Sequence, residues 1–133
     1  MLLPTGTTVA VADGHKLVLF RNTGTATEPE LQALPHAEVD THNKSSGVRK
    51  RADENPGKDN VDEDAFAIGV AELLNASVQA GSIDKLLVIA APRALGQMRG
   101  HYSKGLSGCL IGEIGKELAN HPNASIVKAI VAA

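Results

Sequence analysis

The chain has 133 residues, a formal net charge of −2 and an apolar fraction of 43%. This length predicts one domain over residues 1–133, large enough to bury a hydrophobic core. With so small a net charge, the molecule as a whole is not attracted electrostatically to nucleic acid or to an anionic membrane. A local basic patch is still compatible with this charge. Two Phe, one Tyr and no Trp argue against a single-strand binder, because such proteins stack bases on aromatic side chains.

Cysteine content and hydropathy restrict the class further. The single cysteine, Cys109, excludes an internal disulfide and a cysteine-based zinc site. No apolar stretch approaches the roughly 18 residues of a membrane span. The first residues lack the basic region and long apolar core of a signal peptide. The sequence therefore predicts a cytoplasmic protein without membrane contact.

Three strands are predicted before residue 42. Thr7–Asp13 alternates in the manner of a strand, and Lys16–Arg21 forms a second strand after a tight turn that contains Asp13-Gly14. Glu30–Asp40 is predicted as a third strand, in which Pro35 marks an edge position or a bulge. A hairpin followed by an edge strand is therefore expected.

A polar segment separates these strands from a helix. Residues 42–60 are nearly free of apolar side chains, which predicts a mobile or functional loop. Asp62–Ala80 then carries apolar residues at helical spacing, with three acids at its start that suit the helix dipole. Gly81 is suited to end that helix.

A buried strand running directly into a helix is the clearest feature of the sequence. The unbroken apolar run Lys85–Ala91 predicts a central strand covered on both faces. Pro92 suits the first position of the next helix, which is expected to end near Arg99 and to resume near Ser103.

The segment Leu110–Leu118 fits two structures. Its leucine and isoleucine spacing suits a helix, but glycines cost a helix about 1 kcal/mol each, so we favour a strand. In that strand Leu110, Ile114 and Leu118 would share one face, with Ile111 on the other.

A last helix is predicted over Ala124–Ala132, with Asn123 as its cap. The element order is then β-β-β-α-β-α-β-α. This order predicts an α/β domain with a mixed five-stranded sheet flanked by helices.

The strand-to-helix junction at Pro92 is the strongest candidate site. Ligands of open α/β sheets bind beyond the carboxyl ends of strands, where helix N-termini present free N–H groups. Arg93 and Arg99 could bind phosphate or carboxylate there, assisted by His101, Ser103 and Lys104. The alternative, favoured by residue chemistry alone, is that both arginines pair with Glu113 or Glu117.

A second basic group lies in the polar segment. Arg49, Lys50 and Arg51 could contact RNA phosphates. Because Asp53 and Glu54 follow closely, a solvated loop without a ligand is the favoured alternative.

Catalytic and metal sites find little support. Asp13, Asp40 and Glu117 could surround Mg²⁺ as in nucleases of the RNase H type, but their spacing does not require it. The five histidines show no metal-binding spacing, and no phosphate-binding glycine loop or nucleophile elbow is present. The sequence therefore predicts no catalytic residue, metal or cofactor.

Several segments together form a family pattern: Val9–Gly14, Asn22–Gly24, Leu87–Arg99, Ser103–Lys104, Ile111–Leu118 and His121–Pro122. They resemble the bacterial host-attachment protein family, which usually reads A-P-P-R, L-G-x-x-R, L-S-K and E-I-x-K-D-L-T-H-x-P. The chain departs from that pattern at Ala91, Glu117 and Ala119, where the family has Pro, Asp and Thr.

The resemblance implies both a fold and a cellular role. Host-attachment proteins are named for the attachment of bacteria to host cells, and they are similar to the middle domain of archaeal and eukaryotic release factors and of Pelota. A mixed sheet flanked by helices is therefore expected. A releasing factor needs a Gly-Gly-Gln tip, whereas this chain has no Gly-Gly pair, and its one Gly-Gln, Gly96-Gln97, lies inside a predicted helix.

Two hypotheses follow. The first is a non-catalytic, Pelota-like cytoplasmic binding protein that contacts the ribosome or RNA through the basic residues named above. The second is a phosphate- or nucleotide-directed enzyme that uses a carboxylate-bound metal at the Pro92 helix terminus. A homodimeric adaptor is left open, and the sequence does not identify a small-molecule ligand.

Overall fold

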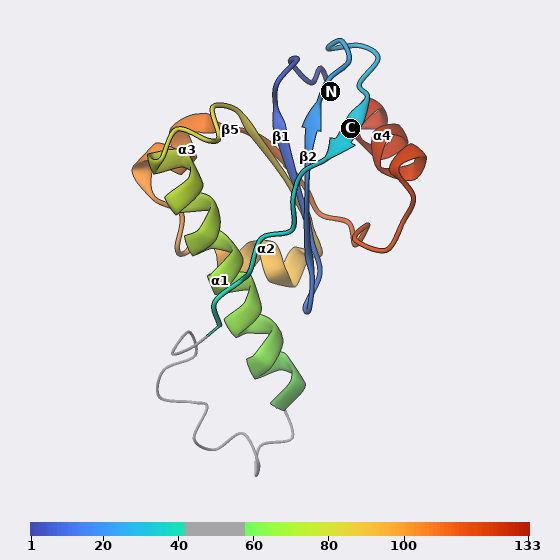
Figure 1. The fold of residues 1–133 in the computed structure, drawn as a ribbon. Coiled ribbons are helices and arrows are strands. Elements are labelled where there is room, and N and C mark those ends of the chain that lie inside the picture. The colour runs from blue at the N-terminus through green and yellow to red at the C-terminus, as the bar shows by residue number, and fades with distance from the viewer. Residues whose placement is uncertain (42–57) are drawn as a thin grey trace.

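The computed structural model describes residues 1–41 and 58–133, which form a five-stranded mixed sheet with helices on both faces (Figure 1). The predicted fold class is therefore confirmed. The strands are β1 (Thr8–Ala12), β2 (Leu17–Asn22), β3 (Leu31–Ala33), β4 (Leu86–Ala90) and β5 (Leu110–Ile114).

The strand order is β3-β2-β1-β4-β5. β1, β4 and β5 run parallel, whereas β2 and β3 pair antiparallel on the other side of β1. The carboxyl ends of the three parallel strands therefore meet at one edge of the sheet, where ligand sites of open α/β sheets form.

The helices of the described chain are α1 (Lys58–Gln79), α2 (Pro92–Arg99), α3 (Lys104–Cys109) and α4 (Asn123–Ala132). In the part of the chain that the structure covers, no helix is both long and apolar enough to cross a bilayer. The first three helices pack on one face of the sheet and α4 packs on the opposite face.

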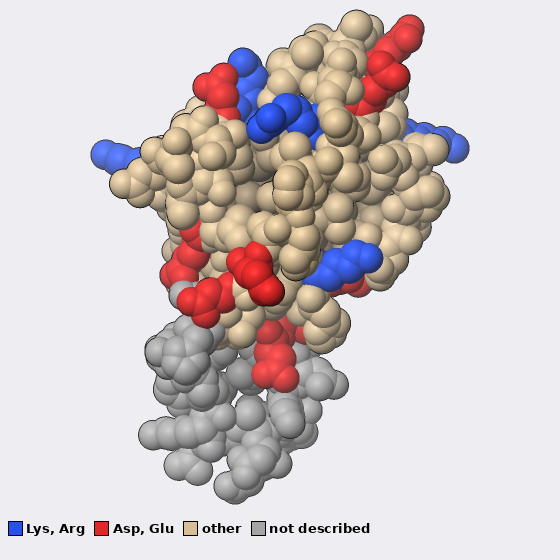
Figure 2. Space-filling view, viewed as in Figure 1, with Lys and Arg blue, Asp and Glu red and all other residues tan. Residues whose placement is uncertain are grey.

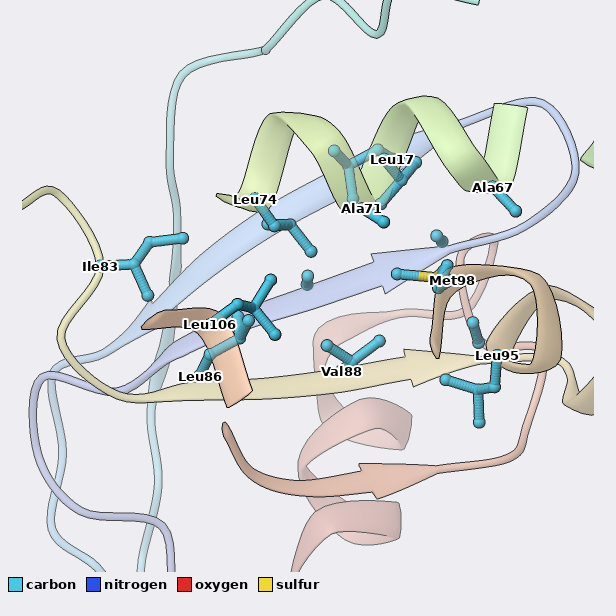
Figure 3. Packing of buried hydrophobic residues seen from close by; sticks show 14 residues of the cluster. Leu17, Ala67, Ala71, Leu74, Ile83, Leu86, Val88, Leu95, Met98 and Leu106 are labelled. Carbon is cyan, nitrogen blue, oxygen red and sulfur yellow. The ribbon is translucent and has the colours of Figure 1, made fainter. Parts of the chain in front are cut away.

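Strand alternation divides the core between these two faces. In β1, Ala10 and Ala12 point to the α1 side, whereas Val9 and Val11 point to the α4 side. On the α1 side (Figure 3), small alanines on β1 and α1 let the helix approach the sheet closely, and leucines of α1 and β4 fill the layer. Each fully buried leucine contributes roughly 1.5–3 kcal/mol relative to an exposed one, so this layer fixes where α2 and α3 sit.

The third strand is shorter than predicted. It ends at Ala33, although the Leu34 N–H still donates to the Leu19 carbonyl at 2.8 Å. Pro35 has no N–H to continue the ladder. The chain then crosses to α1, where the Asp40 carbonyl packs so closely that a Cβ at Gly69 would lie 2.5 Å from it.

α1 begins at Lys58, one turn before the predicted start at Asp62. Residues 58–60, predicted as loop, are therefore helical, and the rest of that loop lies outside the described residues. Asp62, Glu63 and Asp64 consequently occupy the second turn, so the prediction that they sit on the first turn is wrong.

The segment predicted as a strand over Leu110–Leu118 forms one over Leu110–Ile114, and the predicted facing of its side chains is wrong. β5 pairs Leu110 with Leu86 and Gly112 with Leu87, so Ile111 is an extra residue in a bulge. The bulge reverses the alternation: Leu110 packs with the α1-side cluster and Ile114 with the α4-side cluster.

The cap predicted for the last helix is also wrong. Pro122 occupies the N-cap position, and Asn123 is the first helical residue. The Asn123 amide instead donates to the Leu31 carbonyl at 3.3 Å, which ties α4 to β3.

Candidate functional site

The carboxyl ends of the parallel strands open into a cleft of about 210 Å³, which we call the strand-end cleft. It is lined by the β1–β2 turn, the second turn of α1, the start of α2 and one residue after β5. The lining residues are Asp13, Gly14, His15, Glu63, Asp64, Ala91, Arg93, Ala94 and Glu117.

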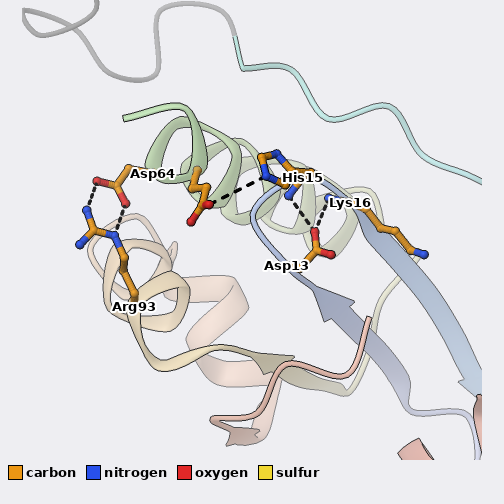
Figure 4. A network of polar contacts seen from close by, with 6 residues as sticks. Asp13, His15, Lys16, Asp64 and Arg93 are labelled. Atoms are coloured by element: carbon orange, nitrogen blue, oxygen red, sulfur yellow. Dashed lines mark hydrogen bonds and ion pairs between the residues drawn. The ribbon is translucent and has the colours of Figure 1, made fainter. Parts of the chain in front are cut away.

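Asp13 lies at the end of β1 and is nearly buried, with 9% of its surface exposed. Its Oδ1 accepts hydrogen bonds from the backbone N–H groups of His15 and Lys16, both at 2.7 Å (Figure 4). Gly14 packs against Glu63 so closely that a Cβ there would lie 2.5 Å from the Glu63 Cγ. The carboxylate of Asp13 thus stabilises the hairpin turn, and the turn is seated on α1.

Arg93 forms a forked ion pair across the cleft. Its Nε and Nη2 donate to the two carboxylate oxygens of Asp64 at 3.2 and 3.0 Å (Figure 4). The His15 Nε2 lies 3.9 Å from the Oε2 of Glu63, which is on α1 next to Asp64. These contacts join α1 to α2 and to the hairpin.

The N-terminus of α2 has the free N–H groups that could bind an anion, but acidic side chains surround it. Ala91 is the N-cap and offers no side chain to the free N–H groups, and Pro92 opens the helix as predicted. However, four carboxylates line the same cleft, and Arg93 is already neutralised by one of them. Like charges within a few ångströms disfavour a phosphate here.

Acidic side chains also dominate the neighbouring surface. Figure 2 shows them gathered over α1, whereas lysines and arginines are scattered over the same face. Asp40 lines a separate groove with Glu38 and Glu72, away from Asp13 and Glu117. Within residues 1–41 and 62–133, no three His, Cys, Asp or Glu side chains converge as metal ligands would. The structure therefore does not bring the RNase H-like set together.

Arg99 lies outside the strand-end cleft and pairs with Glu113 of β5. Its Nε and Nη2 lie 2.9 and 2.8 Å from the Glu113 Oε1, as the alternative interpretation of this arginine predicts. The Tyr102 hydroxyl donates to the Glu113 Oε2 at 2.9 Å. Burial, followed by this hydrogen bond, raises the pKa of Tyr102 well above its ordinary value. The same carboxylate raises the pKa of Arg99 through its hydrogen bond and charge.

The remaining candidates lie in the turn between α2 and α3. Ser103 is the N-cap of α3, and its hydroxyl accepts from the Leu106 N–H at 3.1 Å. His101 and Lys104 are exposed, and neither side chain has an ion pair within the described part of the chain. Arg49, Lys50 and Arg51 lie outside the described residues.

Sequence reasoning misses two partners. The sequence places Asp64 at a helix dipole, but its carboxylate binds Arg93 instead. Nothing in the sequence marks Asn75 as a contact residue, because it lies among the polar residues of an amphipathic helix. Its contacts come from a turn 26 residues away. Neither pairing follows a local spacing rule.

The parallel β1-β4-β5 centre, extended by an antiparallel hairpin and covered by helices on both faces, defines a small mixed-sheet α/β domain. Within that class, the family model described as bacterial archaeo-eukaryotic release factor family 12 matches residues 6–130. The chain belongs to this family, and the predicted relationship to release factors is confirmed. Among curated proteins, none matches the chain.

Proposed function

We propose that this chain is a non-catalytic, Pelota-like member of its family that binds the ribosome or RNA in the cytoplasm. The cellular role proposed from its resemblance to host-attachment proteins is the attachment of bacteria to host cells. Family membership supports a link to translation, and the residues of the chain indicate binding without peptide release.

One observation carries the non-catalytic part. The only Gly-Gln pair, Gly96-Gln97, lies in the middle of α2, between the buried side chains of Leu95 and Met98. A helix anchored in this way offers no flexible backbone tip that could place a water at a peptidyl ester. The charges of Arg93 and Arg99 are also paired, so the proposed contacts are made by the exposed basic side chains and by the basic segment at residues 49–51.

Cosedimentation with purified ribosomes at low and moderate salt tests the binding. The key variant replaces Arg49, Lys50 and Arg51 with Ala, and a matched control replaces the exposed lysines Lys85, Lys116 and Lys128. Removal of one phosphate-binding charge lowers the slope of log affinity against log salt by roughly 0.7–0.9. We expect the slope to fall by about 2 to 3 in the loop variant and to change little in the control.

Three results would overturn the proposal. Absence of the wild-type chain from the ribosomal fraction at low salt excludes ribosome binding, because phosphate contacts are strongest there. Equal losses of affinity in the loop variant and the lysine control would show a diffuse charge effect without a binding site. Release of peptide from a ribosomal complex above the background rate would contradict the non-catalytic assignment.

The attachment role has its own test. A strain lacking the gene should attach less to host cells, and the wild-type chain should restore attachment. We expect the loop variant to fail in this complementation although it is produced at the wild-type level. Restoration by that variant would separate attachment from RNA binding.

A further inference from the structure

The turn that joins α2 to α3 is held by a side chain from a third helix. The Asn75 amide donates through Nδ2 to the His101 carbonyl at 2.7 Å. Its Oδ1 accepts from the Ser103 N–H at 2.9 Å. One side chain thus satisfies a backbone acceptor and a backbone donor two residues apart, which fixes the turn on α1.

The same turn is fixed from two further directions. Tyr102 points inward, packs against the α1-side core and reaches Glu113 of β5 through its hydroxyl. The Ser103 hydroxyl caps α3. His101 and Lys104, which flank these anchored residues, are exposed. The turn therefore presents two basic side chains from a backbone that three elements hold in place, and such preorganisation lowers the entropy cost of binding.

A groove of about 380 Å³ lies beside this turn, between the last turns of α1 and the start of α3. It is lined by Asn75, Val78, Gln79, Ser103, Lys104 and Gly105. Its apolar floor is formed at Gly105, where an added Cβ would lie 3.6 Å from the Val78 Cγ1. The exposed amide of Gln79 can donate and accept hydrogen bonds at the rim.

We propose that this groove, which we call the α1–α3 groove, binds the sugar–phosphate backbone of RNA. Lys104 and His101 bind a phosphate, the floor receives the apolar face of a ribose, and Gln79 meets a ribose hydroxyl. Asn75 is a positioning residue, because both of its polar atoms are engaged with the turn. This inference rests on the proposed function that the chain binds RNA.

A matched pair of glycine substitutions tests the groove. Gly105→Leu fills it, whereas Gly108→Leu, on the same short helix, projects into open space with nothing within 4 Å. Affinity is measured with a fluorescent single-stranded poly(U) 20-mer and with purified ribosomes. We expect Gly105→Leu to weaken binding to both by about tenfold, or about 1.4 kcal/mol, and Gly108→Leu to bind as the wild type does.

Two further variants separate charge from positioning. Lys104→Gln removes a phosphate-binding charge, so the slope of log affinity against log salt should fall by about 0.7–0.9. Asn75→Ala keeps both basic side chains, so affinity should fall while the salt slope is unchanged. A thermal melt accompanies each variant. If Asn75→Ala does not fold, the glycine pair and Lys104→Gln still decide the outcome.

The outcomes distinguish the groove from the proposed function. If Gly105→Leu binds as Gly108→Leu does and Lys104→Gln keeps the wild-type salt slope, the groove proposal is overturned. Continued sensitivity to the 49–51 variant would then leave RNA binding intact. If the wild-type chain binds neither probe at low salt, both proposals fail. Binding to ribosomes without binding to poly(U) would contradict a backbone contact and would favour a ribosomal protein as the partner.

Discussion

The strand-end cleft and the α2–α3 turn differ in whether their charged side chains are engaged in contacts within the protein. In the cleft, Arg93 is bound by Asp64, and the carboxylate of Asp13 is engaged with backbone N–H groups. At the turn, Asn75 and Tyr102 make the structural contacts, which leaves His101 and Lys104 exposed. A residue at the carboxyl ends of parallel strands therefore does not necessarily have a charge that is free to bind a ligand.

The comparison also shows what an anion-binding site requires beyond a helix terminus. The α2 N-terminus has the open N–H groups of such a site, but the surrounding carboxylates oppose the same ligand. The short helix α3 that follows the turn has a smaller dipole than α2, but the exposed Lys104 and His101 give the turn a local charge that favours an anion. The balance of nearby charges, more than the backbone geometry, separates the two regions.

The largest effect should come from Asp13. Asp13→Ala leaves the N–H groups of His15 and Lys16 without their acceptor, so we expect the free energy of unfolding to fall by about 2 kcal/mol. Urea denaturation measures this change. Asp13→Asn retains an acceptor oxygen and should be clearly less destabilised. An Asp13→Ala variant as stable as the wild type would show that this carboxylate is not needed by the hairpin and is free for ligand chemistry.

An intermediate effect is expected at Tyr102, the only tyrosine in a chain without tryptophan. Its raised pKa means that the folded state keeps the proton when the unfolded state loses it, so stability is lost as pH rises above about 10. Spectrophotometric titration should show delayed ionisation in the folded protein. Tyr102→Phe should remove this part of the alkaline destabilisation and cost about 1 kcal/mol at neutral pH.

Glu113→Gln provides the control for Tyr102. It keeps an acceptor for the hydroxyl but removes the negative charge, so the tyrosine should ionise at lower pH than in the wild type. Ionisation of Tyr102 at the pH of free tyrosine in the wild-type protein would contradict the anchored turn.

The smallest effect should come from Arg93. Its side chain is 54% exposed, and exposed ion pairs contribute less than about 1 kcal/mol, so Arg93→Ala should lower stability by no more than that. A double-mutant cycle with Asp64→Ala should give a coupling of about 0.5 kcal/mol. Arg93→Ala should also leave the salt slope of RNA binding unchanged. A fall in that slope equal to the one expected for Lys104→Gln would return the strand-end cleft to the role of a binding site.

Local signals in the sequence are sufficient for much of the fold. The apolar run Lys85–Ala91, followed by Pro92, predicts β4 and the start of α2 to within a residue, because burial on both faces and a fixed φ are local properties. The glycines in the segment Leu110–Leu118 correctly favour a strand over a helix, although the strand ends at Ile114. The lack of a Gly-Gly-Gln tripeptide can likewise be read directly from the sequence.

What the sequence by itself determined is therefore the order of elements, the α/β class and the lack of the releasing motif. Only the tertiary structure decided that Arg93 meets Asp64, that a bulge at Ile111 reverses the facing of β5, and that Asn75 supports the α2–α3 turn. These features depend on side chains 20 or more residues apart being brought together by packing of the core. Local spacing rules carry no information about such partners, and for that reason the charge available at each candidate site became clear only in the folded chain.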